Sequence, residues 1–313
     1  MIYAPIIIPT LNRAEHLKRC IGSLAQNNWA KYTDLIISVD YPPKESYKEG
    51  YKNVCNYLSN TIEGFRKVEI IYQEKNLGAY YNTEFLKKHI YEKYDRYIYT
   101  EDDNEFSPNF IEFIDKGLEL FENDDKIVGI CPGSLTREET EENNIFLTYN
   151  FAAYGYGTWI KKEKQYYETI TRDYCVSLAY DSAFLRKIAK ENYGLFFAFQ
   201  DILFQRGKLY CLEQGKVPII DQTIKLYLIK EKKYVVGACE RKVRNWGYDG
   251  SGVNCPKVEK WQIVDIDKRA GFEYHYNLPM KIEKPECNHT LESYLRILIA
   301  FIKIGIWKIR KRA

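Results

Sequence analysis

Residues 97–103 read Tyr97-Ile-Tyr-Thr-Glu-Asp-Asp103, an apolar strand that ends in three consecutive carboxylates. Adjacent carboxylates at a strand end repel one another unless a cation lies between or near them. Mg²⁺ and Mn²⁺ prefer oxygen ligands and are held by one or two carboxylates together with substrate phosphates. Taken alone, Glu101-Asp102-Asp103 is equally consistent with a metal–phosphate site and with a solvated acidic turn.

The chain before this strand alternates short apolar runs with stretches of helical periodicity. We predict strands at 6–8, 35–40, 68–72, 97–100 and 127–131, and helices at 15–26, 46–58, 79–94 and 107–121. Further helices are expected near 181–190 and 221–230. Strands separated by helices imply right-handed βαβ units. The prediction is therefore an α/β fold with a mostly parallel central sheet flanked by helices.

Polar clusters follow several of these strands. Ligands of an open parallel sheet bind beyond the carboxyl ends of its strands. Pro9-Thr-Leu-Asn-Arg13, Asp40 and the acidic triple stand at such ends. Lys75-Asn-Leu-Gly78 follows the third strand, with Asn82 one helical turn later, and Gly78 would let the backbone approach a ligand. Each cluster also has an ordinary explanation as a helix cap, a turn or a solvated side chain.

Composition narrows the function classes. The net charge of +3, from 46 basic and 43 acidic residues, does not suggest nucleic-acid binding. Eight scattered cysteines without a CxxC pair, and only four histidines, do not suggest a zinc site. The first residues lack the basic and apolar regions of a signal peptide, so we expect a cytoplasmic protein with reduced cysteines.

The order of these clusters resembles the GT-A fold glycosyltransferases. The sequence is most similar to the inverting family 2 and to the N-acetylglucosaminyltransferase I-like enzymes of bacterial glycan synthesis, whose metal motif is also Glu-Asp-Asp. The resemblance covers roughly residues 5–135. Each motif is weak alone, but four motifs in the same order at matching strand ends form a specific pattern.

The resemblance implies a role for each matching residue. Asp40 would contact the nucleotide base, Asp103 would bind Mn²⁺ or Mg²⁺ directly, and Asp102 would face the ribose or the donor sugar. The remaining residues implied for the nucleotide or donor pocket are Pro9, Thr10, Arg13, Asn76, Gly78, Asn82 and Glu101. A UDP-sugar is the favoured donor.

Two glycine-rich aromatic stretches stand in the second half. Arg244-Asn-Trp-Gly-Tyr-Asp-Gly-Ser-Gly252 resembles a loop of bacterial sugar transferases that folds over a ligand, and its candidate residues are Trp246, Gly250 and Ser251. Tyr154-Gly-Tyr-Gly-Thr-Trp159 resembles a stretch that borders the acceptor site, with Tyr156 and Trp159 as candidates. The ordinary explanations are a surface turn for the first stretch and core packing for the second.

An inverting transfer needs a carboxylate that takes the proton of the acceptor hydroxyl. In relatives this carboxylate usually opens a helix after the aromatic stretch, often beside a tryptophan. Asp221, in Ile219-Ile-Asp-Gln-Thr223, fits that place best, although the tryptophan is missing. Asp201 is the second candidate and Asp249 the third. Each of the three is also explained as a helix N-cap.

Residues 291–313 are dense in apolar side chains and end in a basic cluster. Arg296 and Lys303 interrupt the apolar residues, so the longest run, Ile297–Ile302, is far short of the roughly 20 residues that a membrane span requires. Trp307 and the basic end suit an amphipathic helix at an anionic membrane surface. The alternatives are a helix packed on the domain and an oligomer contact.

Together these observations predict a metal-dependent glycosyltransferase, a hexosyl- or N-acetylhexosaminyltransferase. The resemblance alone implies that it inverts by direct displacement with an aspartate base. Its acceptor is expected to be a glycan or a lipid-linked glycan, at the inner face of the membrane. We expect a catalytic domain at 1–285, with a donor half at 1–105 and an acceptor half at 106–285, and a basic tail at 286–313. The alternatives are a nucleotidyltransferase and a non-catalytic binding subunit of the same fold.

Overall fold

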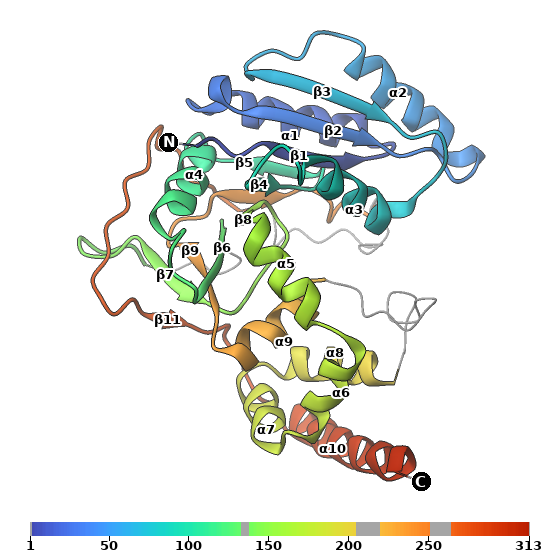
Figure 1. Cartoon of the computed structure of the whole chain (residues 1–313), viewed down its shortest axis with the longest axis vertical. Helices are drawn as coiled ribbons and strands as arrows, with labels where there is room; N and C mark the ends of the chain where they lie inside the picture. The colour runs from blue at the N-terminus through green and yellow to red at the C-terminus, as the bar shows by residue number, and fades with distance from the viewer. Residues whose placement is uncertain (1, 133–137, 205–219, 251–263, 313) are drawn as a thin grey trace. The chain divides into compact units, whose positions relative to one another are not determined.

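The computed structural model describes residues 2–132, 138–204, 220–250 and 264–312 (Figure 1). The chain divides into two compact units. The larger unit comprises residues 1–147, 152–161 and 235–281. The smaller unit comprises residues 148–151, 162–234 and 282–313.

A twisted sheet forms the centre of the larger unit. Its parallel part has the strand order β3-β2-β1-β4, formed by β1 (Ile6–Thr10), β2 (Asp34–Val39), β3 (Lys67–Tyr72) and β4 (Arg96–Tyr99). Next to β4 lies β8 (Tyr156–Trp159), which is antiparallel to both β4 and β6 (Ile127–Cys131). β9 (Tyr234–Ala238) and β7 (Ile145–Thr148) follow β6 in the sheet.

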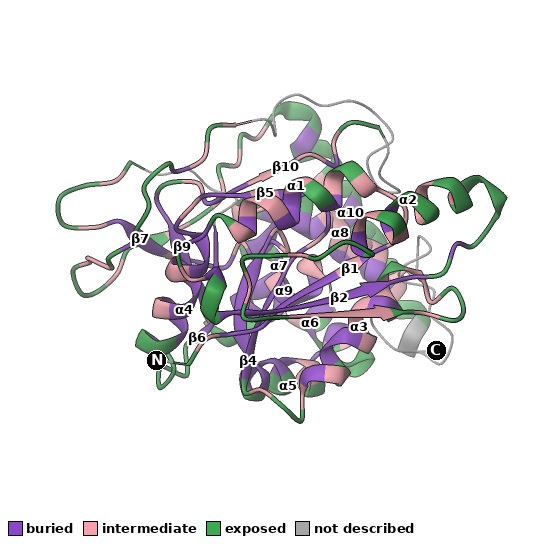
Figure 2. Ribbon diagram, turned by 90° about the horizontal axis from the view of Figure 1, so that it is seen from above, coloured by how far each residue is buried: buried purple, intermediate pink, exposed green. Residues whose placement is uncertain are grey.

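Helices cover the parallel part of this sheet, which explains its continuous apolar strands. Figure 2 shows α1 (Ala14–Ala25) and α2 (Lys48–Leu58) on one face and α3 (Gly78–Ile90) on the other. α4 (Phe110–Leu120) packs against β6 and β8. Helix α1 buries Leu17, Ile21 and Leu24, the apolar face expected from their helical spacing. Two short 3-10 helices, η1 (Ala30–Tyr32) and η2 (Glu45–Tyr47), complete this part.

The observed elements confirm the predicted α/β fold with its mostly parallel sheet and flanking helices. Several boundaries differ from the prediction by one to four residues, and β7, β8 and β9 were not predicted. The helix expected from Ser107 begins at Phe110, because the chain first forms β5 (Asn104–Phe106). β5 pairs antiparallel with β10 (Val243–Asn245), and the backbone N–H of Ser107 extends this ladder by donating to the carbonyl of Lys242.

The smaller unit is largely helical. It contains α6 (Arg172–Tyr180), α7 (Ser182–Glu191), α8 (Tyr193–Leu203), α9 (Asp221–Glu231) and α10 (Leu291–Arg312), with most of α5 (Ile160–Thr169) and the short strand β11 (Ile282–Glu283). The side chains of Thr171, Asp181 and Asn192 cap α6, α7 and α8. Helices α7 and α9 match the two predicted near 181–190 and 221–230.

Candidate active site

The acidic triple forms the turn between β4 and β5. Asp102 and Asp103 are buried, with 4% and 7% of their surface exposed, whereas Glu101 is half-buried. Asn104 fixes the turn, because its side-chain amide donates to the hydroxyl of Thr100 at 3.0 Å. The two buried carboxylates therefore need partners within the protein, since burial of an unpaired charge is costly.

Arg13 is the main partner of both carboxylates. Its Nη1 lies 2.8 Å from Oδ2 of Asp103, and its Nη2 donates to Oδ1 of Asp102. The other two oxygens also accept hydrogen bonds. Oδ2 of Asp102 accepts from the hydroxyl of Thr10 at 2.7 Å, and Oδ1 of Asp103 accepts from the side-chain amide of Asn245 at 2.9 Å. All four carboxylate oxygens thus have a donor.

The ionisation of these groups follows from their burial. Burial raises the pKa of Asp102, the positive charge of Arg13 opposes that shift, and the neighbouring Asp103 reinforces it. Burial lowers the pKa of Arg13, but the carboxylates of Asp102 and Asp103 outweigh burial, so its pKa lies above the ordinary value. Arg13 therefore remains a cation, and the turn is a desolvated charge cluster.

The cluster as arranged does not fit a divalent metal ion. Such an ion needs free carboxylate lone pairs and room for further oxygen ligands. The guanidinium of Arg13 takes the place of the cation here. Within the described ranges, no group of three or more His, Cys, Asp or Glu side chains is gathered for a metal. A metal on Asp103 requires Arg13 to move.

Asp40 holds the loop between β3 and α3 against the end of β2. Its carboxylate accepts the backbone N–H groups of Leu77 and Gly78, both at 2.8 Å, and the side-chain amide of Asn76 at 3.0 Å. Gly78 has φ +77, a conformation that favours glycine. Asp40 thus organises the predicted donor loop, while its own side chain is only 3% exposed.

Asn82 lies in α3 and is 1% exposed. Its side chain accepts from the hydroxyl of Ser38 at 2.5 Å and donates to the carbonyl of Ser38 at 3.2 Å. It therefore ties α3 to β2 and supports the loop from within. Pro9 and Thr10 end β1 beside the acidic turn, and Thr10 reaches Asp102 as described.

The segment 244–250 lies against the acidic turn because β10 pairs with β5. The backbone N–H of Trp246 donates to the carbonyl of Asp103 at 2.8 Å. Glu105 accepts from the indole of Trp246 at 2.6 Å and from Arg244 at 2.8 Å. Gly250 has φ +89. Ser251, also predicted for this loop, lies outside the described residues.

Asp249 is the one predicted base candidate in the described part of this unit. Its Oδ2 lies 3.1 Å from Nε2 of His16, and its side chain is 44% exposed. Nε2 of His16 also lies 3.4 Å from the carbonyl of Trp246. The other two candidates belong to the smaller unit, where Asp201 lies in the last turn of α8 and Asp221 is the first residue of α9. Neither is an N-cap, because Asn192 and Ile220 hold those positions.

The aromatic stretch 154–159 is mostly buried. Trp159 is 4% exposed and donates its indole N–H to the carbonyl of Leu118 at 3.1 Å. Tyr156 is 3% exposed, and its ring lies 5.5 Å from that of Tyr99. Core packing therefore accounts for both residues. Tyr154 reaches the 244–250 segment, since its hydroxyl lies 2.9 Å from that of Tyr248.

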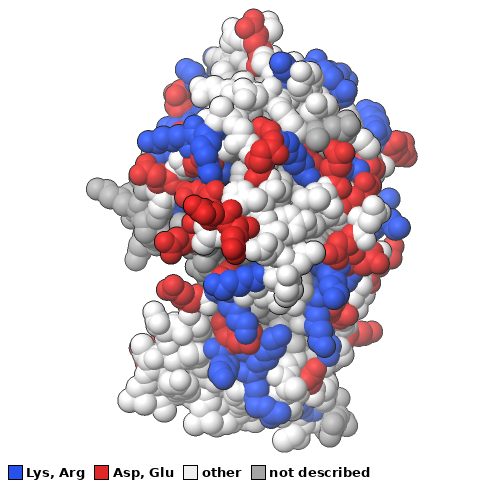
Figure 3. All heavy atoms as spheres, turned by 90° about the vertical axis from the view of Figure 1, so that its left-hand side faces the viewer, with Lys and Arg blue, Asp and Glu red and all other residues white. Residues whose placement is uncertain are grey.

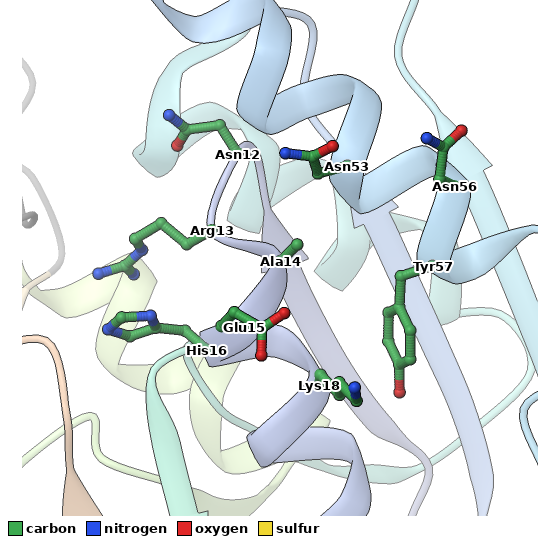
Figure 4. Close-up of a pocket in the computed structure, with 9 residues that line it drawn as sticks. All are labelled: Asn12, Arg13, Ala14, Glu15, His16, Lys18, Asn53, Asn56 and Tyr57. Carbon is green, nitrogen blue, oxygen red and sulfur yellow. The ribbon is translucent and has the colours of Figure 1, made fainter.

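A pocket of about 500 Å³ opens beside the β1–α1 turn. It is lined by Asn12, Arg13, Ala14, Glu15, His16, Lys18, Asn53, Asn56 and Tyr57. Figure 4 shows Arg13 and His16 extending in the same direction from this turn, with Asn53, Asn56 and Tyr57 on α2. The pocket thus adjoins the cation of the acidic turn.

Sequence reasoning did not find His16, Glu105 or Asn245. His16 stands three residues after Arg13, on the same face of the first turn of α1. Glu105 and Asn245 belong to paired strands of three residues each, which are too short for a periodic signal. Their contacts with Trp246 and Asp103 depend on a pairing between segments about 140 residues apart.

The match to a known protein family lies in the first half of the chain. The GNT-I family model matches residues 1–154, which contain the acidic turn and the Asp40 loop. No curated protein matches the chain. The chain spans 28% of the length of S. aureus TarS, which matches 50% of this chain at 12% identity with a TM-score of 0.34.

Two further solved structures are similar over larger shares of their length. Residues 1–349 of S. aureus TarS match at 13% identity, covering 76% of this chain and 60% of that one, with a TM-score of 0.37. The mannosyltransferase PcManGT from Pyrobaculum calidifontis, in complex with GDP-Man and Mn²⁺, matches at 8% identity over 52% of this chain and 46% of that one, with a TM-score of 0.37. Because these TM-scores are low, we assign the site residues from the geometry of this chain alone. The chain therefore resembles the GNT-I family over residues 1–154.

Proposed function

We propose that this chain transfers a hexosyl or N-acetylhexosaminyl group from a nucleotide-diphosphate sugar, with a UDP-sugar favoured, to a glycan or lipid-linked glycan. The observation that carries the proposal is the buried pair of Asp102 and Asp103, neutralised by Arg13 at the carboxyl end of the parallel sheet. Ligands bind at this edge in open parallel sheets. The GNT-I family match spans the same residues.

In this proposal the donor lies across the β1, β2 and β4 ends. Asp40 fixes the loop 76–78, whose backbone would line the nucleotide pocket. Arg13 presents a planar guanidinium beside the acidic turn, and such a group pairs well with phosphate oxygens. We assign the nucleotide to the strand-end and loop residues Pro9, Thr10, Asp40, Asn76 and Gly78, and the diphosphate to the neighbourhood of Arg13.

We also propose that transfer depends on Mn²⁺ or Mg²⁺, on the condition that Arg13 leaves the carboxylates. Arg13 and a divalent ion would both place positive charge on Asp102 and Asp103, and the carboxylate oxygens already have donors. We therefore propose that the metal and the Arg13–Asp103 ion pair exclude each other. An Arg13 that has left the carboxylates would be free to meet the donor phosphates.

The transfer step needs one carboxylate base. The acceptor hydroxyl oxygen forms a bond to the anomeric carbon as the bond to the nucleoside diphosphate breaks, and the carboxylate takes the hydroxyl proton. We propose Asp249 as the first residue to test, because it is solvent-accessible and pairs with His16 beside Arg13. Asp221 and Asp201 remain the alternatives in the smaller unit.

We extend the proposal to the domain organisation of the chain. We propose that residues 1–105 form the donor half and 106–285 the acceptor half of a catalytic domain, with a basic tail at 286–313. We further propose that the enzyme works on glycans at the inner face of a bacterial membrane. In the described residues, no helix is long and apolar enough to cross a bilayer.

A donor-hydrolysis screen tests the proposed function. The purified chain is incubated with a panel of UDP-, GDP- and dTDP-sugars, with and without Mn²⁺, and the released nucleoside diphosphate is measured. We expect one class of nucleotide sugar to be hydrolysed slowly and Asp103→Ala to remove that activity while the variant still unfolds in a cooperative thermal transition. Hydrolysis of no nucleotide sugar, together with binding of nucleoside triphosphates, would instead favour a nucleotidyltransferase.

A further inference from the structure

Helix α10 carries an apolar stripe on its solvent-facing side. The stripe consists of Leu291, Leu295, Leu298, Ile302, Ile306 and Ile309, which follow one another at intervals of three or four residues. This spacing places all six on one side of the helix. Their exposed fractions run from 46% at Ile306 to 78% at Leu291. Scattered exposed apolar residues are ordinary, but a continuous stripe of this length marks an interaction surface.

The opposite side of α10 packs within the smaller unit. Ala300 and Ile304 are 2% and 1% exposed, and Ser293 is 6% exposed. The ring of Phe301 lies 5.0 Å from that of Phe196 on α8. This second face supplies the contacts of α10 with its own unit, so the stripe remains exposed.

Basic side chains flank the stripe along one edge. Arg296, Lys303 and Arg310 are exposed and follow at intervals of seven residues, which keeps them in one row beside the stripe. Lys308 lies on the other flank, 5.4 Å above the ring of Tyr180. The helix contains a single acidic residue, Glu292, placed 4.0 Å from Arg296. Lys and Arg side chains also gather in the lower part of the face that Figure 3 presents.

We propose that α10 binds flat on an anionic lipid bilayer, with the stripe in the acyl boundary and the basic row at the headgroups. An apolar face without an interrupting charge, bordered by cations, is the pattern of an interfacial helix. The positive charge of the row is complementary to anionic lipid, whereas an apolar protein groove would leave that charge without a counterpart. The attachment that we propose is peripheral, through α10 lying in the interface. This inference goes beyond the proposed transfer and stands without it.

Vesicle co-sedimentation of the full chain tests this binding. Vesicles of phosphatidylcholine alone are compared with vesicles that contain one part phosphatidylglycerol to three parts phosphatidylcholine. We expect the protein to sediment with the anionic vesicles and to be released as salt is raised, because basic residues near such a surface contribute roughly fivefold each to the partition coefficient. Each variant is first checked by circular dichroism and thermal unfolding.

Two sets of variants separate the apolar and charged contributions. Leu298→Glu with Ile302→Glu places charges in the middle of the stripe, and we expect it to reduce partitioning at least about tenfold. Leu120→Glu, at a 49% exposed position on α4, is the matched control and is expected to bind like the wild type. Replacing Arg296, Lys303 and Arg310 by Gln is expected to lower binding to anionic vesicles roughly a hundredfold. Lys52→Gln on α2 is its control.

Two outcomes overturn the proposal. The first is a folded wild-type chain that sediments with neither vesicle composition at low salt. The second is a wild-type chain that binds no vesicles but forms a dimer in analytical ultracentrifugation without lipid, with the dimer abolished by Leu298→Glu together with Ile302→Glu. In that case a second copy of the chain covers the stripe. Neither outcome bears on nucleotide-sugar hydrolysis, so the proposed function is judged separately.

Discussion

The guanidinium of Arg13 lies 2.8 Å from a carboxylate oxygen of Asp103 and also pairs with Asp102, so a side chain supplies the positive charge at the acidic turn. Removing one partner of a buried ion pair leaves an uncompensated charge. The contact between Arg13 and Asp103 therefore affects both the stability of the acidic turn and the access of metal ions to it.

Arg13→Ala is expected to lower stability in the presence of a chelator by roughly 3–5 kcal/mol, because it leaves two buried carboxylates without their cation. Arg172→Ala, an exposed arginine on α6, serves as control and is expected to change stability little. Urea unfolding of the three proteins measures the effect.

The same variant tests the exclusion between Arg13 and a metal. Without nucleotide, Arg13→Ala is expected to bind Mn²⁺ at least about tenfold more tightly than the wild type, because the carboxylates are then free. Titration calorimetry and the electron paramagnetic resonance signal of free Mn²⁺ give the affinities. Equal Mn²⁺ affinity in wild type and variant would show that Arg13 does not occupy the place of the metal.

Asp40→Ala is expected to destabilise the chain by about 1–3 kcal/mol even without nucleotide, because the backbone N–H groups of Leu77 and Gly78 lose their acceptor. Hydrogen exchange should accelerate at these two amides and leave β4 unchanged. A variant that loses nucleotide binding but keeps wild-type exchange at 77 and 78 would assign Asp40 to the base alone.

The base is identified by comparing Asp249→Asn, Asp221→Asn and Asp201→Asn. We expect Asp249→Asn to retain nucleoside diphosphate affinity and to lose transfer by at least about a hundredfold, since Asn keeps the size of the side chain but cannot accept the proton. Near-normal transfer by Asp249→Asn would move the role to whichever of the other two variants is inactive.

Asp115 makes stability depend on pH. Its carboxyl group is fully buried, Oδ2 has no partner among the described residues, and burial raises its pKa to about 8 from the ordinary 3.8. Because the pKa of Asp115 is higher in the folded chain, its protonated carboxyl group contributes to stability. This contribution is fully present below the pKa of Asp115 in the unfolded chain and is lost as pH rises toward 8. We expect unfolding free energy to fall between pH 5 and pH 7 by about 1 kcal/mol per pH unit more in the wild type than in Asp115→Asn.

Thermal or urea unfolding of both proteins at several pH values checks this slope. Asp173→Asn, an exposed carboxylate on α6, should keep the wild-type slope. Identical slopes in wild type and Asp115→Asn would mean that the Asp115 carboxyl ionises normally in the folded chain.

The sequence predicted β1–β4 and β6 because strands and helices alternate with clear periodicity up to residue 131, whereas β7, β8 and β9 were not predicted. Residues 6–8 of β1 and all of β6 are continuous apolar runs, and this local pattern is sufficient to assign them. Helices α1 and α3 were predicted for the same reason.

The site was less predictable because its contacts are distant in sequence. Arg13 meets Asp102 only once β1 and β4 become neighbours, and Asn245 meets Asp103 only through the short β5–β10 pairing. Asp249 reaches His16 across more than 200 residues. The acidic motif indicated a functional role for Asp103, but the sequence pattern did not identify Arg13 as the residue that neutralises it.

The central claim is that the acidic turn binds the diphosphate of a nucleotide sugar. Isothermal titration of the wild-type chain and of Asp103→Ala with UDP, GDP and dTDP, each with and without Mn²⁺, tests it most directly. We predict that one nucleoside diphosphate, with UDP favoured, binds the wild type and that Asp103→Ala weakens this binding at least about tenfold. Failure of every nucleoside diphosphate to bind the folded wild-type chain, with or without Mn²⁺, would contradict the claim.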